Sequence, residues 1–157
     1  MKGARDCACR SGLRYTACCA PVHRGEREPE TASLLVRARY AAFALALGGY
    51  LARTLATEHA DHGIDPAALT RDLVRLRGIR RFLGVAIWHE STTAATAEVL
   101  FHARMFEHGR DVSLVELSDF RRESGAWRYE SGRAAQRGFL PNPLTPLTRE
   151  EFLAKLG

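Results

Sequence analysis

The pattern of hydrophobic and polar positions changes near the middle of the chain. Up to about residue 78, apolar side chains recur every three or four residues, which is the spacing of an amphipathic helix. Beyond that point apolar and polar residues alternate, which is typical of strands with one face on a core. The sequence therefore predicts helices first and strands afterwards.

The helical part predicts three helices, over residues 31–47, 50–58 and 65–78. Thr31 or Ser33 can cap the first helix, and the Gly48-Gly49 pair is expected to end it, because glycine commonly follows the last helical turn. Pro66 stands at the first position of the third helix, where proline is well tolerated.

The alternating part predicts four antiparallel strands, over residues 82–88, 97–107, 112–122 and 126–130. Short connections containing His108-Gly109 and Ser124-Gly125 suit hairpins. Helices followed by such a meander indicate an α+β fold, with about three helices packed on one face of a curved antiparallel sheet. Residues 134–157 hold three prolines and a short helix from Thr148, and this tail is expected to lie on the surface of the domain.

All four cysteines fall within one short segment near the start, CACRSGLRYTACC: they are Cys7, Cys9, Cys18 and Cys19. Four thiolates at the two ends of a small loop can surround a metal ion, and Ser11-Gly12 suits a tight turn. The first residues lack the apolar core of a signal peptide, so a cytoplasmic location is expected, where thiols stay reduced. The segment predicts a metal site. Zn²⁺ is favoured and iron is possible, because zinc needs no electron-transfer surroundings.

A disulfide or a redox pair remains the alternative for these thiols. A Cys18–Cys19 bridge would close a strained vicinal ring, which counts against the disulfide. His23 is the only early histidine, and it could serve a reactive thiol as a base or the metal as a spare ligand.

The charge of the chain is uneven. The net charge is +5, and residues 1–27 hold six basic side chains against two acidic ones. Residues 71–81 form a second basic stretch, with Arg71, Arg75, Arg77, Arg80 and Arg81 against one aspartate. Such stretches are usually solvated surface, but they also suit an acidic partner. No aromatic residues alternate with the basic ones, so nucleic acid is possible as a partner but not favoured. No apolar run is long enough to span a bilayer.

The cysteine segment resembles the SEC-C metal-binding motif, which also ends the bacterial preprotein translocase ATPase. The matching positions are Cys7, Cys9, Ser11, Gly12, Tyr15, Cys18 and Cys19. Ala8 and Arg10 depart from the motif, since proline and glycine are common there, but neither is a ligand. Residues 34–55 and 99–132 are in turn similar to the YchJ family. That resemblance implies a SEC-C knuckle at residues 1–27, a domain like nuclear transport factor two (NTF2) at residues 28–133, and the tail. It implies little about activity.

Domains of this kind commonly have a cavity between the helices and the sheet. Glu116 shares a strand face with Leu114 and Phe120, so its carboxylate is expected to point inward. A buried carboxylate needs a partner, and Arg39 is the expected one, with Tyr40 and Tyr129 as hydroxyl donors. This group predicts either a structural ion pair or a ligand-binding or catalytic cavity.

The sequence carries no nucleophile elbow, phosphate-binding loop or HExxH pattern, and His59 and His62 fall in a polar segment that predicts a loop. We therefore interpret the chain as a zinc-binding interaction module rather than an enzyme, whose basic knuckle docks a protein, ribosomal or translocation-related partner. A ligand-binding or catalytic cavity around Glu116 and Arg39 is the alternative interpretation. RNA binding through the basic stretches is a second one.

Overall fold

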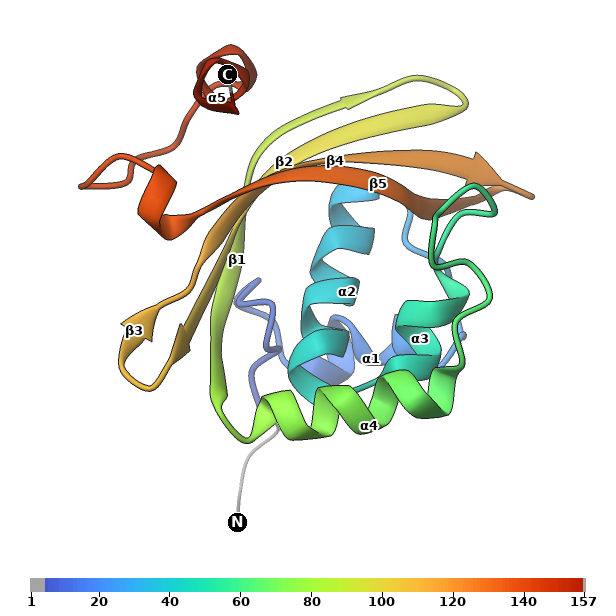
Figure 1. Ribbon diagram of the computed structural model, residues 1–157. Helices are drawn as coiled ribbons and strands as arrows, with labels where there is room; N and C mark the ends of the chain where they lie inside the picture. Colours follow the sequence, from blue (N-terminus) through green and yellow to red (C-terminus); the bar gives the residue numbers. More distant parts are fainter. Residues whose placement is uncertain (1–4, 157) are drawn as a thin grey trace.

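The protein is an α+β structure in which an antiparallel sheet curves around the main helix (Figure 1). The computed structural model describes residues 5–156. The elements before the sheet are η1 (Tyr15–Ala17), α1 (Ala20–His23), α2 (Ala32–Leu45), α3 (Gly48–Arg53) and α4 (Pro66–Arg77). They are followed by β1 (Arg80–Thr92), β2 (Thr96–Glu107), β3 (Arg110–Asp111), β4 (Leu114–Glu123), β5 (Ala126–Gln136), η2 (Arg137–Phe139) and α5 (Arg149–Leu156). The predicted fold class is confirmed.

The sheet follows the chain as a meander, with strands in the order β1-β2-β4-β5 and the short β3 paired with β2. Every neighbouring pair is antiparallel. The β2–β3 hairpin turns through His108 and Gly109, whose φ angles are 49° and 77°. Two consecutive positive φ angles match the twist of a two-residue hairpin loop, so this connection lies where the sequence predicts it.

Two strands are longer than the sequence predicts. β1 begins at Arg80 and continues to Thr92, and β5 continues to Gln136. Register shifts between Phe82 and Gly84 and between Ile87 and His89 interrupt β1, and another lies where β4 pairs with β5. A bulge inserts one residue and so reverses which side chains face the core. The alternation of apolar residues therefore fails before the strand ends.

The second helix is shorter than predicted, because α3 ends at Arg53 rather than continuing to residue 58. The chain after it pairs with β5 instead. The N–H of Tyr129 donates to the carbonyl of Thr54 at 2.9 Å, and the N–H of Ala56 donates to the carbonyl of Tyr129 at 2.8 Å. These two bonds add a short parallel bridge to the sheet edge, and they replace the helical bonds that the local sequence would allow.

The first helix also ends differently from the prediction. Leu45 is its last residue, and Ala46 adopts the left-handed conformation with a φ of 59°. Gly48 begins α3 and has a packing role. A Cβ on Gly48 would lie 2.7 Å from the backbone nitrogen of Thr70 and 2.8 Å from the carbonyl oxygen of Pro66. A residue without a side chain is needed there because α4 packs directly on this backbone.

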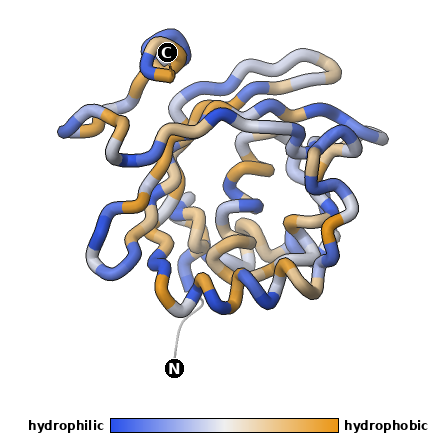
Figure 2. Tube along the Cα trace, in the orientation of Figure 1, coloured by the Kyte–Doolittle hydropathy of each residue, from blue (hydrophilic) through white to orange (hydrophobic). Residues whose placement is uncertain are grey.

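The concave face of the sheet holds the main core. The residues that are almost fully buried in it include Leu35 of α2 and, on the strands, Val99, Phe120 and Trp127. α4 crosses the open side below α2 and α3, and Figure 2 shows hydrophobic and hydrophilic positions alternating along it. Leu73 is the buried residue of this helix. Over residues 5–156, no helix is long and apolar enough to cross a membrane.

The opposite face of the sheet holds a second, smaller core. Val115 and Leu117 of β4 are buried there against Leu140, Leu147 and Phe152 of the C-terminal tail. Figure 1 shows α5 on the side of the sheet away from α2. Both faces of the central strands are thus covered by the same chain.

Candidate metal centre and neighbouring cavity

The four cysteine sulfurs lie together at one side of the domain. All four Sγ atoms are within 4.8 Å of one another. The distance from Cys18 Sγ is 3.7 Å to Cys9 Sγ and 3.8 Å to Cys19 Sγ. Zinc–sulfur bonds of about 2.3 Å in a tetrahedron separate the sulfurs by about 3.8 Å. Four cysteines in this arrangement can hold one metal ion with little movement.

The local backbone explains how so short a segment gathers four thiols. The N–H of Arg10 donates to the carbonyl of Cys7 at 2.9 Å, and the N–H of Cys7 donates to the carbonyl of Leu13 at 2.9 Å. Arg10 and Gly12 have φ angles of 62° and 93°. The left-handed conformation at Arg10 gives a physical reason for the glycine that is common at this position of the SEC-C motif.

Hydrogen bonds among the thiols shift their pKa values in opposite directions. Hydrogen bonds from Cys19 and Cys7 lower the pKa of Cys9 far below its usual range, and the hydroxyl and N–H of Ser11 lower it further. The same bonds to Cys7 and Cys9 raise the pKa of Cys19. A metal ion displaces the protons of the thiols that bind it, so the affinity of such a site for the metal depends on pH.

Ser11, which the sequence predicts only as a turn residue, also contacts one of the cysteine sulfurs. Its hydroxyl oxygen lies 3.2 Å from Cys18 Sγ. A hydroxyl that holds a ligand sulfur in place is typical of the partners surrounding metal ligands. The signal for this role was available in the sequence, since Ser11 is one of the positions that match the SEC-C motif.

His23 is neither a spare metal ligand nor a base for the thiols, because both of its ring nitrogens are engaged elsewhere. Nδ1 lies 2.7 Å from the hydroxyl of Tyr15, and Nε2 lies 2.7 Å from the carbonyl oxygen of Ala38. Burial is the main cause that lowers the pKa of His23. The ring therefore donates through Nε2 and accepts through Nδ1. All four cysteines are free thiols in the structure.

The cysteine segment is packed onto the domain rather than extended from it. Cys7, Cys9 and Cys19 are buried in the same apolar cluster as α2. The carbonyl of Cys9 accepts hydrogen bonds from the N–H of Val85 in β1 and from the Arg37 guanidinium in α2, both at 3.3 Å. A metal ion bound by the four thiols would therefore fix this loop against both a strand and a helix.

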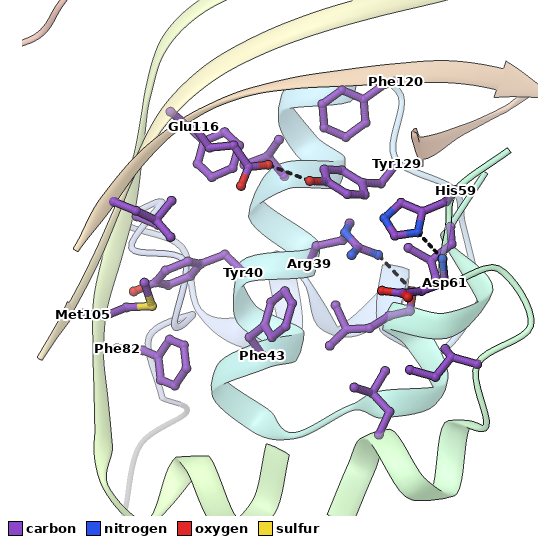
Figure 3. Close-up of a pocket in the computed structure, with 18 of the residues that line it drawn as sticks. Arg39, Tyr40, Phe43, His59, Asp61, Phe82, Met105, Glu116, Phe120 and Tyr129 are labelled. Carbon is purple, nitrogen blue, oxygen red and sulfur yellow. Dashed lines mark hydrogen bonds between the residues drawn. The ribbon is translucent and has the colours of Figure 1, made fainter. Parts of the chain in front are cut away.

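A cavity of about 400 Å³ lies between the helices and the concave face of the sheet (Figure 3). Arg39, Tyr40, Glu116 and Tyr129 all line it, so the four residues that the sequence grouped together do meet in one space. Their contacts with each other differ from those predicted.

Glu116 is held by neighbours on its own strand and on β5. The hydroxyl of Tyr129 donates to Oε2 of Glu116 at 2.8 Å, and the hydroxyl of Ser118 donates to the same oxygen. A Cβ on Gly132 would lie 2.6 Å from the Tyr129 hydroxyl and 2.7 Å from Cδ of Glu116. Gly132 therefore leaves the space that this pair occupies. Burial, and then the charge of Glu116, raise the pKa of Tyr129.

Arg39 does not form the predicted ion pair with Glu116. Its Nη1 donates to the hydroxyl of Thr54 at 2.6 Å and to the carbonyl of Leu51 at 3.0 Å. These acceptors lie at the end of α3, which ends earlier than the sequence predicts. Cζ of Arg39 lies 4.8 Å from the centroid of the Tyr129 ring. Burial lowers the pKa of Arg39 to about 10, which leaves the guanidinium charged at neutral pH.

Tyr40 is not a donor to Glu116 either. Its hydroxyl donates to the carbonyl of Arg104 at 2.7 Å and accepts from the N–H of Gly84 at 2.7 Å. Burial raises the pKa of Tyr40 to about 12. The ring borders the cavity, while the hydroxyl connects α2 to the bulged part of β1.

His59 is a cavity residue that the sequence did not identify. It lies in the predicted loop after α3, yet its ring centroid is 5.4 Å from that of Tyr129. Nδ1 accepts from the N–H of Asp61 at 2.9 Å. No sequence pattern marks this contact, because it depends on the pairing of Thr54 and Ala56 with β5.

The second basic stretch is partly neutralised. Arg75 pairs with Asp72 at 3.1 Å, and Arg80 pairs with Glu107 at 2.6 Å. Arg77 donates to the carbonyl of Leu45 at 3.2 Å. Three of its five arginines therefore contact groups of this chain.

A curved antiparallel sheet packed on α2, α3 and α4, with a four-cysteine loop at its side, defines an NTF2-like domain with an N-terminal knuckle that could hold a metal ion. Residues 31–132 match the family described as YchJ, middle NTF2-like domain. The chain is 32% identical over 136 residues to the UPF0225 protein YchJ of Shigella dysenteriae serotype 1 (strain Sd197), covering 84% of this chain and 85% of that one. The chain belongs to the YchJ family.

Two solved structures of SEC-C motif-containing proteins are similar over most of the chain. The solution structure of one from Rhodopseudomonas palustris has 30% identity and a TM-score of 0.71, and covers 83% of this chain and 99% of that one. The crystal structure of one from Psychrobacter arcticus has 21% identity and a TM-score of 0.64, and covers 91% of this chain and 84% of that one. The second likeness shows the fold alone.

Proposed function

We propose that Cys7, Cys9, Cys18 and Cys19 bind one Zn²⁺ ion as four thiolates, and that this ion has a structural role. The observation that supports this most directly is the spacing of 3.7 and 3.8 Å between sulfurs, which suits a tetrahedral zinc site. Four protein ligands leave no open position for a substrate, and this is typical of structural zinc. Iron is the alternative metal, since four thiolates suit both.

Metal content tests this proposal. Protein purified without added metal should contain about one zinc per chain, and Cys18→Ser should lose most of it. Thr16→Ala is a matched control, because Thr16 is exposed in the same segment and should leave the zinc content unchanged. Iron in place of zinc would give a coloured protein and would overturn the choice of metal. Absence of both metals would overturn the site.

The exposed surface of the knuckle supports a docking role. Arg10, Arg14 and Arg24 are exposed, and Leu13 is 53% exposed between the first two of them. Within residues 5–156, none of these three arginines has an ion-pair partner. Unpaired cations around an exposed leucine suit an acidic surface that also offers an apolar contact. We propose an acidic protein as the partner of this face.

Comparative capture from a bacterial lysate tests the docking role. The double variant Leu13→Ser, Arg14→Ser should lose specific partners that the wild type retains. The double variant Arg71→Ser, Val74→Ser is the matched control on α4, where Val74 is 48% exposed. Identical partner sets for the wild type and the knuckle variant would exclude this face from docking. Loss of the partners after nuclease treatment would point to RNA instead.

A further inference from the structure

Four charged residues among residues 5–156 line the cavity, and two of them, Arg39 and Glu116, are of opposite sign and do not pair with each other; Arg80 pairs with Glu107, and Asp61 is exposed to solvent. Within the described residues, Arg39 and Glu116 form no ion pair, although both line the same space (Figure 3). The walls around them are mainly apolar and include Phe43, Phe82, Phe101, Met105 and Phe120. Placing a charge among apolar side chains without a charged partner costs free energy of folding. Two such charges in one cavity therefore call for a functional explanation.

Arg39 is anchored by one nitrogen and keeps its other donors free. Nη1 makes both hydrogen bonds of the side chain, to Thr54 and Leu51. No group within residues 5–156 accepts from Nε or Nη2. These two neighbouring N–H groups form the parallel donor pair that binds a carboxylate through both oxygens. The anchoring at Thr54 and Leu51 holds this pair in position before any ligand arrives.

Glu116 is anchored in a similar way. Oε2 accepts from both Tyr129 and Ser118, whereas Oε1 has no donor within the described residues. The ring of Tyr129 also lies against the Arg39 guanidinium. A single tyrosine therefore contacts both charged groups and keeps them separate. Arg39 therefore has two free donors, Nε and Nη2, and Glu116 has one free acceptor, Oε1, among the residues that line the same cavity.

We propose that this cavity binds a small, largely apolar carboxylic acid that also carries a hydroxyl or ammonium donor. The ligand carboxylate accepts from Nε and Nη2 of Arg39, and the ligand donor bonds to Oε1 of Glu116. The apolar body packs against Phe43, Phe101 and Met105. A volume of about 400 Å³ is adequate for such a molecule.

Arg39 decides the charge of the ligand. Glu116 already accepts two hydrogen bonds from the protein, which compensate part of its charge. Arg39 donates only to a hydroxyl and a carbonyl, which are neutral acceptors. Asp61 is the other carboxylate among the described residues of the lining, but it is exposed to solvent and forms no ion pair with Arg39. The larger unmet charge away from solvent is therefore the positive one, so an anionic ligand fits better than a cationic one.

Four probes that share a phenyl group separate these contributions, and NMR titration of the full chain measures their binding. They are 3-phenyllactate, 3-phenylpropanoate, 3-phenylpropanol and phenethylamine. 3-Phenylpropanoate should bind about 10-fold or more tightly than 3-phenylpropanol, because only its carboxylate forms charged hydrogen bonds with Arg39. 3-Phenyllactate should bind more tightly still. Phenethylamine should bind most weakly.

Variants assign each contribution to its residue. Arg39→Gln should remove the preference for a carboxylate, and Glu116→Gln should remove only the advantage of 3-phenyllactate. Arg71→Gln and Glu150→Gln are matched controls on exposed residues and should change neither. Arg39→Lys keeps the charge without the paired donors and should retain only part of the preference.

The proposal is overturned if no probe saturates, if phenethylamine or 3-phenylpropanol binds as tightly as 3-phenylpropanoate, or if Arg39→Gln keeps the preference. If Arg39→Gln does not fold, the wild-type titration decides. Shifts confined to Phe43, Phe101 and their neighbours support the cavity, and shifts elsewhere contradict it. The zinc proposal is independent, because metal content should not change in any of these variants.

Discussion

The hydroxyl of Tyr15 and Nδ1 of His23 lie 2.7 Å apart, which connects the cysteine loop to the helical layer. The second nitrogen of His23 bonds to the carbonyl of Ala38 in the middle of α2. His23 therefore connects the cysteine loop to the main helix through one hydrogen bond on each side of its ring. This arrangement explains why the chain keeps a histidine beside four thiols without using it as a ligand.

Tyr15→Phe should lower the free energy of unfolding by about 1 kcal/mol, because it removes one partly buried hydrogen bond and keeps the ring. Urea unfolding of the metal-loaded protein measures the change. A double-mutant cycle with His23→Phe should show a coupling of at least about 0.5 kcal/mol. Additive effects of the two substitutions would contradict a direct Tyr15–His23 bond.

Gly84 and Arg10 should behave as a coupled pair. A Cβ on Gly84 would lie 2.9 Å from Cβ of Arg10, and Gly84 has a φ of 129°. Gly84→Ala should therefore destabilise the protein by about 1–3 kcal/mol. Arg10→Gly removes the overlap, so the cost of Gly84→Ala should be smaller in that background.

Arg10→Ala is the control for this pair, because it retains the Cβ and should rescue less than Arg10→Gly. Denaturant midpoints of the single and double variants provide the comparison. Equal costs of Gly84→Ala in all three backgrounds would show that the two residues do not touch.

Gly132→Ala should disturb the Glu116–Tyr129 hydrogen bond, because the new methyl group would overlap both side chains. We expect a loss of about 1–3 kcal/mol in stability and a shift of the Tyr129 ring resonances. Gly138→Ala is the matched control, since a Cβ there meets no atom within 4 Å. Equal effects of the two substitutions would contradict the close packing at Gly132.

Stability should fall as the pH drops below about 6.5, in part because of His102. Burial lowers the pKa of His102, and the nearby Arg104 and Arg137 lower it further, while Asp111 opposes them. The unfolded chain therefore binds a proton at this position at a higher pH than the folded one. Neutral His102 therefore contributes stability at pH values above its pKa in the unfolded chain. This contribution is lost as the pH falls through the lower pKa that His102 has in the folded protein.

His102→Gln should flatten the decrease in unfolding free energy between pH 7 and pH 5. His62→Gln is the control, because His62 is exposed in a turn and should leave the slope unchanged. Release of the metal at low pH affects both variants equally, so the difference in slope reports on His102. An unchanged slope in His102→Gln would remove this residue from the pH response.

The order of helices and strands, and the gathering of the cysteines, follow from local pattern. Periodicity identifies α2, α4 and the central strands, because each buries one face over many residues. The spacing within residues 7–19 is itself a short-range constraint, so the four thiols meet where the sequence predicts.

The cavity contacts depend on long-range pairing that no local pattern encodes. Strand pairing at Thr54 and Ala56 ends α3 early and brings Thr54 to Arg39, so the expected bond to Glu116 is absent. Tyr40 bonds to the backbone at Arg104 and Gly84, because a bulge in β1 frees an N–H beside it. The inward direction of Glu116 was predictable from strand alternation, whereas its partners were not.

The decisive measurement for the four-thiolate centre is X-ray absorption at the zinc edge of the protein as purified. We expect four sulfur neighbours at about 2.3 Å and no nitrogen or oxygen directly bound to the metal. Cys18→Ser should reduce the sulfur count or lose the metal. A site with fewer than four sulfurs, or with a histidine nitrogen, would contradict the four-thiolate centre.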